Sequence, residues 1–347
     1  MLTVYSEDHR GHAPKYELTF GEFLPCFEKP SRAEMVLARV KEVGLGPVVA
    51  PEDFGRAPLA RVHTDAFLDF LEAAWGLWTE QTGSEADALP EAFVTRGLRQ
   101  IEPGSIYGKL GYYAIDCAAP ITAGTWAAAR ASANAALTAQ RQVAEGAVGN
   151  GAAFALCRPP GHHAAADTIG GYCYLNNAAI AAQAFGDQGA ERVAVLDVDY
   201  HAGNGTQAIF YRRGDVLFAS LHGHPKMEYP YYLGYAEETG EGDGEGANLN
   251  YPLIHGTEWP AYAEALDDAC AKIAAYGPDV LVISLGVDTY KDDPISKFKL
   301  ESAHYPRIGE KIAALKRPTL FLMEGGYAVE EIGINAVGVL TGFEGAG

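Results

Sequence analysis

Residues 192–201 read RVAVLDVDYH, a short apolar segment that runs directly into three ionisable side chains. The apolar part, Arg192–Leu196, has the composition of a strand that is buried on both faces of a sheet. In an open parallel sheet, binding sites form beyond the carboxyl ends of the strands. Asp197, Asp199 and His201 follow at that end. We therefore expect an α/β fold with its chemistry at one edge of the sheet.

Other apolar, β-branched segments predict further buried strands, at Leu2–Tyr5, Ala152–Leu156, Val216–Ala219, Val280–Leu285 and Thr319–Met323. Apolar residues recur with helical spacing between the strands, at Thr125–Val143, Trp259–Ala275 and Tyr305–Leu315. Thr125 is the expected N-cap of the first of these helices. Alternating strands and helices predict a mainly parallel central sheet with helices on both faces, a three-layer α/β/α architecture.

The composition is that of a globular chain. Hydrophobic residues make up 48% of its 347 residues and charged residues 20%, which excludes a disordered or fibrous protein. We see no repeat and no low-complexity linker, so we expect residues 1–347 to form one domain. Two segments are predicted to be excursions from the sheet: Trp78–Tyr113 and the acidic, glycine-rich loop Glu237–Gly246.

The net charge narrows the range of partners. With 26 basic and 45 acidic residues, the chain carries a formal charge of −19. We therefore expect such a chain to repel nucleic acid and to attract small cations. The simpler explanation is that the negative charge only keeps the protein soluble. No apolar run approaches the ~18 residues of a membrane span, and the N-terminus lacks a signal-peptide pattern. Five scattered cysteines without a CxxC motif predict free thiols in a reducing cytoplasm.

The spacing of Asp197, Asp199 and His201 points to a metal ion. In an extended chain these alternate residues share one side, and two bare carboxylates there would repel each other. Asp288, after the strand Val280–Leu285, could supply a third ligand. Three protein ligands leave room for water or substrate, and mixed oxygen and nitrogen ligands suit Zn²⁺ and also Fe²⁺. The alternative is a loop whose Asp side chains accept hydrogen bonds from backbone amides.

Other strand ends carry polar groups as well. His162 and His163 follow the strand Ala152–Leu156, and such a pair can take and return protons near neutral pH. Tyr327 follows the strand Thr319–Met323 and can donate a hydrogen bond to a developing oxyanion. Taken alone, the two histidines are more simply interpreted as a chance surface pair, and Tyr327 as a tyrosine packed at a strand end. Ser220 and His222 follow the strand Val216–Ala219. The convergence of five polar strand ends on one rim favours a shared site.

Taken together, the motifs RPPGHH, GGYCYLNNAA, DVDYHAGNGTQ, SLGVDTY and MEGGY resemble those of the zinc-dependent histone deacetylase family, which has the arginase–deacetylase fold. The similarity extends from residues 6–9 to the C-terminal helix and is greatest with the bacterial acetylpolyamine amidohydrolases. It implies hydrolysis of N-acetylated polyamines, such as acetylputrescine, acetylcadaverine and acetylspermidine, to acetate and the free amine. Deacylation of acetyl-lysine in proteins is an alternative, and a catalytically lapsed binding protein is a more remote one.

The resemblance assigns a role to each residue of the rim. It implies that zinc, or Fe²⁺, binds to Asp199, His201 and Asp288. It makes His162 and His163 the proton-transfer pair, oriented by Asp197 and Asn204, and it makes Tyr327 the oxyanion donor. Because Asn204 stands where the family often has Asp, we expect His163 to be the base and His162 the more cationic partner. A structural K⁺ is expected at Asp197, Asp199, His201, Ser220 and Leu221.

The resemblance also implies a substrate channel. Tyr172 and Tyr229 match its aromatic walls, and the carbonyl of Gly171 would accept the substrate amide N–H. Glu17 would bind a distal ammonium group; Tyr107 stands where an acid would be expected from the family, and Asp116 is an acid nearby. The insertion at 78–113 is expected to narrow that mouth at a homodimer interface. Ala202 stands where the family usually has a second histidine, and we expect activity to survive this change.

Overall fold

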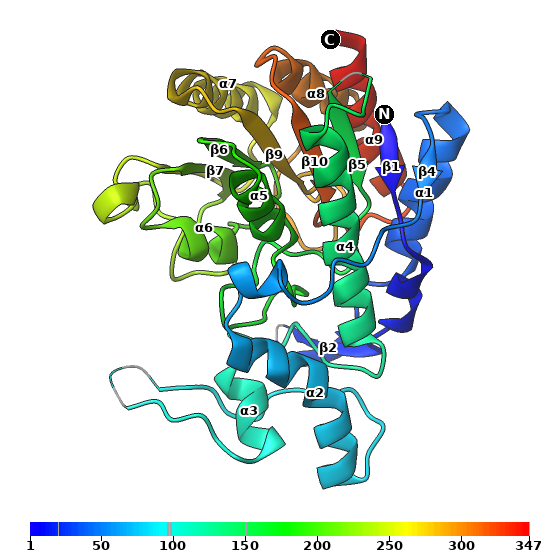
Figure 1. Ribbon diagram of the computed structural model, residues 1–347, viewed down its shortest axis with the longest axis vertical. Helices are drawn as coiled ribbons and strands as arrows, with labels where there is room; N and C mark the ends of the chain where they lie inside the picture. The colour runs from blue at the N-terminus through cyan, green and yellow to red at the C-terminus, as the bar shows by residue number, and fades with distance from the viewer. Residues whose placement is uncertain (20, 96, 98, 150, 347) are drawn as a thin grey trace.

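The computed structural model describes residues 1–19, 21–95, 97, 99–149 and 151–346. Its central feature is a parallel sheet with strand order β4-β1-β5-β10-β9-β6-β7-β8 (Figure 1). The strands are β1 (Leu2–Val4), β4 (Val48–Val49), β5 (Ala152–Ala155), β6 (Val193–Asp197), β7 (Val216–Gly223), β8 (Asn248–Leu253), β9 (Val280–Leu285) and β10 (Thr319–Met323). An antiparallel hairpin, β2 (Tyr16–Thr19) and β3 (Glu22–Pro25), stands apart from this sheet.

Helices connect the strands and cover the sheet. The α-helices are α1 (Ser31–Val43), α2 (Asp65–Thr82), α3 (Ile106–Tyr112), α4 (Thr125–Ala144), α5 (Asn177–Asp187), α6 (Asn204–Phe210), α7 (Trp259–Tyr276), α8 (Tyr305–Ala313) and α9 (Ile332–Ala346). Four short 3-10 helices complete the described elements: η1 (Glu7–Gly11), η2 (Leu59–Arg61), η3 (Gly242–Gly244) and η4 (Ser302–His304).

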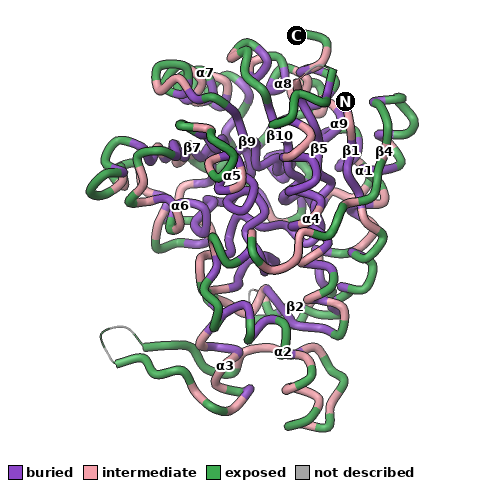
Figure 2. Tube along the Cα trace, viewed as in Figure 1, coloured by how far each residue is buried: buried purple, intermediate pink, exposed green. Residues whose placement is uncertain are grey.

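Alternating side chains of each strand build two separate cores. In β9, Leu281 and Ile283 pack with α1, α7, α8 and α9, whereas Val280 and Val282 pack with α4 and α5. This alternation follows from the two-residue period of a strand. The inner strands are therefore largely apolar, and they lie in the buried centre of the molecule (Figure 2). The predicted three-layer α/β/α architecture with a mainly parallel sheet is confirmed.

Two edge strands, β4 and β8, were not predicted. In β8, Asn248 and Asn250 are buried and give the segment a polar pattern. Both amides bind the Oε1 of Gln207, at 3.2 and 2.8 Å respectively, so the edge strand is held by hydrogen bonds as well as by its ladder to β7. Because strand prediction here depended on apolar runs, it missed a strand with polar inward side chains.

The predicted start of the helix at α4 is wrong in one respect. Gly124, not Thr125, occupies the N-cap position, and Thr125 is the first helical residue. The Thr125 hydroxyl instead accepts a hydrogen bond from the backbone N–H of Thr122 at 2.7 Å and lies 3.0 Å from His12 Nδ1. It therefore ties the preceding turn and η1 to the helix rather than capping the helix.

The segment Trp78–Tyr113 begins inside α2 and contains α3, at the end of the molecule farthest from the N- and C-termini (Figure 1). Its Arg96 and Leu98 lie outside the described residues. Leu110 and Tyr113 are buried in an apolar cluster with residues of α2, α4 and α5, so the insertion is packed onto the rest of the chain. Within the described ranges, no helix is both long and apolar enough to cross a membrane. All five cysteines are free thiols.

Candidate active site

Adjacent strand ends bring three potential metal ligands together. Asp199 and His201 follow β6, and Asp288 follows β9, which is hydrogen-bonded to β6 in the sheet. One ligand atom from each residue lies within 4.8 Å of the others, and all three residues are buried. His201 Nδ1 is 3.0 Å from Asp288 Oδ2 and 3.4 Å from Asp199 Oδ1.

The surroundings of these ligands fit a divalent cation. Asp199 Oδ2 accepts a hydrogen bond from the N–H of Gly325 at 2.8 Å, and Asp288 Oδ1 accepts one from the N–H of Tyr200 at 2.8 Å. Each carboxylate is thus oriented by the backbone while oxygen capacity remains free. A Cβ at Gly286 would lie 2.0 Å from Asp199 Oδ2, so only glycine leaves room for this ligand. Two carboxylates and an imidazole suit Zn²⁺ or Fe²⁺.

The tandem histidines, His162 and His163, lie next to this ligand set, and the centroids of their rings are 4.0 Å apart. His162 Nδ1 is 2.9 Å from Asp197 Oδ2, and His163 Nδ1 is 2.6 Å from Asn204 Oδ1. Burial opposes charge on His162, but the carboxylates of Asp199 and Asp197 outweigh it and raise its pKa to about 10. Burial and the neighbouring His162 lower the pKa of His163 well below its ordinary value.

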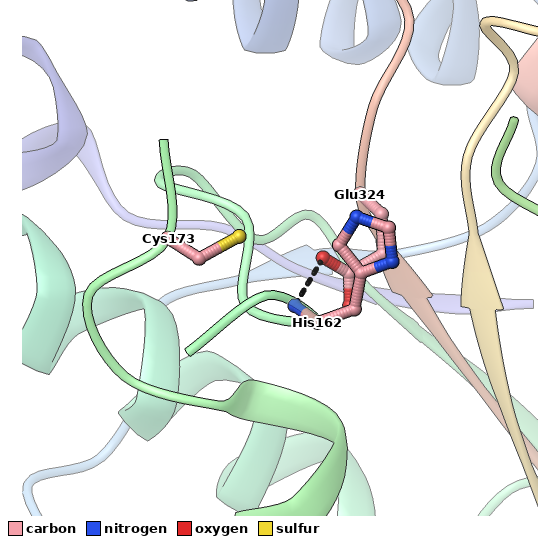
Figure 3. A group of neighbouring side chains, drawn as sticks. All are labelled: His162, Cys173 and Glu324. Atoms are coloured by element: carbon pink, nitrogen blue, oxygen red, sulfur yellow. Dashed lines mark hydrogen bonds between the residues drawn. The ribbon is translucent and has the colours of Figure 1, made fainter. Parts of the chain in front are cut away.

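Glu324 lies beneath the histidine pair and has no role in the sequence-based prediction. It is fully buried after β10, and its Oε2 accepts a hydrogen bond from the N–H of Gly161 at 2.7 Å. The same oxygen accepts one from the N–H of His162 at 3.2 Å (Figure 3). Its other oxygen accepts one from the Ser284 hydroxyl at 3.2 Å. Burial raises the pKa of Glu324 to about 7. The carboxyl group therefore holds the turn that carries His162, although Glu324 could be recognised in sequence only as a polar residue at a strand end.

A pocket of about 250 Å³ opens onto the ligand set. Its walls include the side chains of Tyr172, Tyr229 and Tyr327, with His163 and His201 at its inner end. The Tyr172 and Tyr327 rings lie 5.5 Å apart, and the Tyr229 ring lies 4.9 Å from that of His163. The structure thus brings both predicted wall residues and the predicted oxyanion donor to one space.

Gly171 also lines this pocket, and the chain needs glycine there for two reasons. Its φ is +48°, and a Cβ would lie 2.3 Å from His163 Cδ2. Its carbonyl accepts a hydrogen bond from the Cys173 thiol at 3.4 Å. A side chain at this position would therefore clash with the His163 ring, and glycine lets the backbone approach that ring closely.

Tyr327 is held by groups that sequence reasoning missed. Its backbone N–H donates to Asp293 Oδ2 at 2.7 Å, and the Arg32 guanidinium lies 4.7 Å from its ring centroid. Arg32 also donates to the carbonyls of Gly326 and Glu324, each at 2.6 Å, and so fixes the loop on both sides of Gly325. Burial raises the pKa of the Tyr327 phenol well above its ordinary value, so the hydroxyl keeps its proton at neutral pH.

The predicted mouth residues occupy different environments. Glu17 does not line the pocket: it is 1% exposed, and its Oε1 accepts a hydrogen bond from the Tyr172 hydroxyl at 3.0 Å. Tyr107 is also outside the pocket, exposed and packed edge-on against Trp78. Asp116 does line the pocket. The direct contact expected between Glu17 and an ammonium group at the mouth is therefore not available in this arrangement.

The residues expected at a monovalent cation lie on neighbouring strands. Asp197 of β6 and Ser220 of β7 are partners in the strand register, followed by Leu221. The Ser220 hydroxyl is 2.7 Å from His222 Nδ1, and His222 Nε2 is 2.8 Å from the carbonyl of Gly234. Ala202 is buried against the same Gly234, where a Cβ would lie 2.9 Å from the Ala202 Cβ.

Comparison with known proteins gives a consistent set of relatives. A family model described as the histone deacetylase domain matches residues 26–342. The chain is 64% identical to acetylpolyamine amidohydrolase 1 of Pseudomonas aeruginosa, over 100% of this chain and 99% of that protein. It is 49% identical to the acetylpolyamine amidohydrolase of Mycoplana ramosa, over 99% and 100% of the two chains. The crystal structure of acetylpolyamine aminohydrolase from Burkholderia pseudomallei matches with a TM-score of 0.93 and 41% identity, covering 100% and 99%.

Proposed function

This chain belongs to the histone deacetylase family, and from that premise we propose that it hydrolyses the amide of N-acetylated polyamines, releasing acetate and the free amine. The chain is an amide-cleaving hydrolase of this family. Relatives named acetylpolyamine amidohydrolases, at 49–64% identity over nearly the whole chain, support the choice of substrate. The proposed substrates are those of the acetylputrescine, acetylcadaverine and acetylspermidine class.

One observation carries this proposal. The aromatic walls formed by Tyr172, Tyr229 and Tyr327 enclose a pocket that ends at His163 and at the ligand set of Asp199, His201 and Asp288. Such walls suit an extended aliphatic chain, and the inner end suits the acetamide that it carries. The excess of 19 negative charges attracts a cationic substrate toward this pocket.

The ligand set would hold zinc, with Fe²⁺ as the alternative. When bound there, the ion supplies Lewis acidity that polarises an amide carbonyl and makes water acidic near neutral pH. Asn204 fixes one ring nitrogen of His163 and leaves Nε2 facing the pocket. His163 is the base that takes the proton of the attacking water at Nε2, and the histidine pair returns a proton to the leaving amine. A structural K⁺ bound between β6 and β7, at Asp197 and Ser220, would order the loop that carries the ligands.

The Tyr327 hydroxyl stabilises the tetrahedral oxyanion. It keeps its proton at neutral pH and faces the same pocket as His163. A donor already fixed in place reduces the reorganisation needed as negative charge develops on the carbonyl oxygen. The Gly171 carbonyl accepts the N–H of the substrate amide and sets its orientation.

We also propose that the chain is one deacetylase domain whose insertion at 78–113 forms a homodimer interface beside the channel mouth. Several apolar side chains of the insertion are exposed, at Phe93, Val94, Ile101 and Tyr107. Exposed apolar surface of this kind favours association with a second copy. Light scattering at micromolar concentration tests the dimer, and a monomer would refute it.

The substrate class is tested by steady-state turnover of N-acetylputrescine, N-acetylcadaverine, N⁸-acetylspermidine and an acetyl-lysine peptide. The zinc-loaded enzyme is compared with a chelated control. We expect metal-dependent turnover, with a preference for the free polyamines. A preference for the peptide would assign the same chemistry to protein deacylation, and bound metal without turnover of any acylated amine would support a binding protein.

A further inference from the structure

We propose that Glu228 is the residue that binds the free ammonium group of the substrate, at the outer part of the pocket. The inference rests on the proposed function, because a monoacetylated polyamine keeps at least one such cation. It identifies the specificity-determining carboxylate, which neither the motifs nor the names of the relatives provide.

The first step is elimination among the carboxylates near the channel. Glu17 is 1% exposed, and its Oε1 already accepts a hydrogen bond from the Tyr172 hydroxyl. Among the described residues that line the pocket, the acids are Asp116 and Glu228. One of these two must therefore meet the cation, unless the general negative field alone attracts it.

Asp116 is already committed to the wall. Its Oδ2 accepts hydrogen bonds from the Tyr229 hydroxyl at 2.6 Å and from the Gly171 N–H at 2.9 Å. Its Oδ1 accepts one from the Ala118 N–H at 2.8 Å. An ammonium group binding here would have to displace donors that hold both sides of the channel. Asp116 is therefore a positioning residue for Tyr229 and Gly171.

Glu228, in contrast to Asp116, has an exposed partner that a substrate cation can displace. Its side chain is 14% exposed, and its Oε1 pairs with His255 Nε2 at 2.5 Å. The His255 side chain is 39% exposed, so it can move into solvent and leave the carboxylate to a substrate cation. Glu228 lines the pocket directly before the wall residue Tyr229 in the chain, and it is not one of the candidate metal ligands.

The backbone below Glu228 fixes where its side chain lies. A Cβ at Gly223, the last residue of β7, would be 3.0 Å from Glu228 Cγ and 2.9 Å from Tyr200 Cζ. The Glu228 stem therefore lies directly over the end of the strand. A partly buried, held carboxylate binds an ammonium group more strongly than a fully hydrated one, because less solvent screening and less side-chain entropy oppose the contact.

The test uses two substrates that differ only at the distal end. N-acetylputrescine carries the ammonium group, and N-pentylacetamide replaces it with a methyl group. We expect Glu228→Gln to lower kcat/KM for N-acetylputrescine about tenfold, mainly through KM, and to leave kcat/KM for N-pentylacetamide unchanged. Glu237→Gln, at an exposed position outside the pocket, makes the same change in net charge and should leave both values unchanged.

The outcomes separate this inference from the proposed function. If the parent enzyme shows no preference for N-acetylputrescine over N-pentylacetamide, the polyamine function itself fails. If the parent prefers N-acetylputrescine and Glu228→Gln keeps that preference, or lowers both activities equally, the role of Glu228 is refuted while the function stands. His255→Ala offers a second test that retains the carboxylate: the preference should be kept or increased, and its loss would also refute the inference.

Discussion

Glu28 is the buried anion whose removal should destabilise this protein most clearly. Its Oε1 lies 2.8 Å from Arg32 Nη1 and 2.8 Å from Arg158 Nε, and none of the three side chains is more than 2% exposed. Glu28→Gln keeps the shape of the side chain but removes its charge. Two guanidinium cations then remain buried without a carboxylate partner.

The magnitude follows from what the arginines retain. Breaking a buried ion pair by removing one partner typically costs about 3–5 kcal/mol. Arg32 keeps its two carbonyl acceptors, and Arg158 keeps the carbonyls of His9 at 2.6 Å and His12 at 2.8 Å. We therefore expect the lower end of this range, a loss of about 3 kcal/mol, which is roughly a hundredfold change in the folding equilibrium.

Urea unfolding measures this loss, followed by tryptophan fluorescence and by circular dichroism to establish that the two transitions coincide. Glu34→Gln is the matched control, because Glu34 pairs with Arg10 at the same 2.8 Å but both side chains are about half exposed. Its cost should stay below about 1 kcal/mol. Equal losses for the two variants would refute the argument that burial sets the value of the Glu28 ion pairs.

The pH dependence supplies an independent check. Burial alone would raise the pKa of Glu28, but Arg158 and Arg32 outweigh it and hold the pKa below its ordinary value. The stabilisation by Glu28 is therefore fully present above the unfolded-state pKa of about 4.3 and is lost as the pH falls through the folded-state value. The difference between parent and Glu28→Gln should narrow in acid, and a gap that widens in acid would contradict this assignment.

Three further changes test the site. Tyr327→Phe should lower kcat for N-acetylputrescine about 10²–10³-fold with little change in KM, measured as initial rates of acetate release, and a fully active variant would exclude the oxyanion role. Gly286→Ala places a Cβ 2.0 Å from Asp199 Oδ2, so the zinc content of the purified variant should fall well below that of the parent; an unchanged content would contradict this steric argument. Tyr229→Phe removes the 2.6 Å hydrogen bond to Asp116 and should destabilise the chain by about 1–2 kcal/mol in urea unfolding. Burial raises the pKa of Asp116, and the Tyr229 hydroxyl opposes this by donating to the ionised carboxylate, so that loss should be greater at neutral pH than in acid; a loss independent of pH would argue against an ionised Asp116.

The arrangement of the rim could be predicted because parallel strands end together. Segments that are buried on both faces have few polar residues, so the polar side chains after β5, β6, β9 and β10 mark where those strands stop. Strand polarity then brings Asp199, His201 and Asp288 to one edge. The same logic fails for β8, because Asn248 and Asn250 make its inward side chains polar.

The channel mouth could not be predicted in the same way. Glu17 lies on β2, where strand alternation turns it inward and its neighbours Tyr16 and Leu18 outward, but four residues, YELT, do not reveal which face is buried. The contacts that decide its environment come from Tyr172, 155 residues away in the chain. A motif match identifies such a residue without specifying whether its carboxylate meets solvent, substrate or another side chain.

The inner end of the pocket is built at the ends of strands, whereas its outer part is built from loops. The inner end depends on glycines and backbone amides that tolerate almost no change, as at Gly286 and Gly171. The outer part is built from Asp116 and Glu228, each on a loop between secondary structure elements. Asp116 is tied to Gly171 and Tyr229, so the loop of Glu228 is the part of the mouth that can change without moving the hydrolytic centre. Paralogues of one ancestral enzyme could therefore specialise on different amines by drift at the mouth alone.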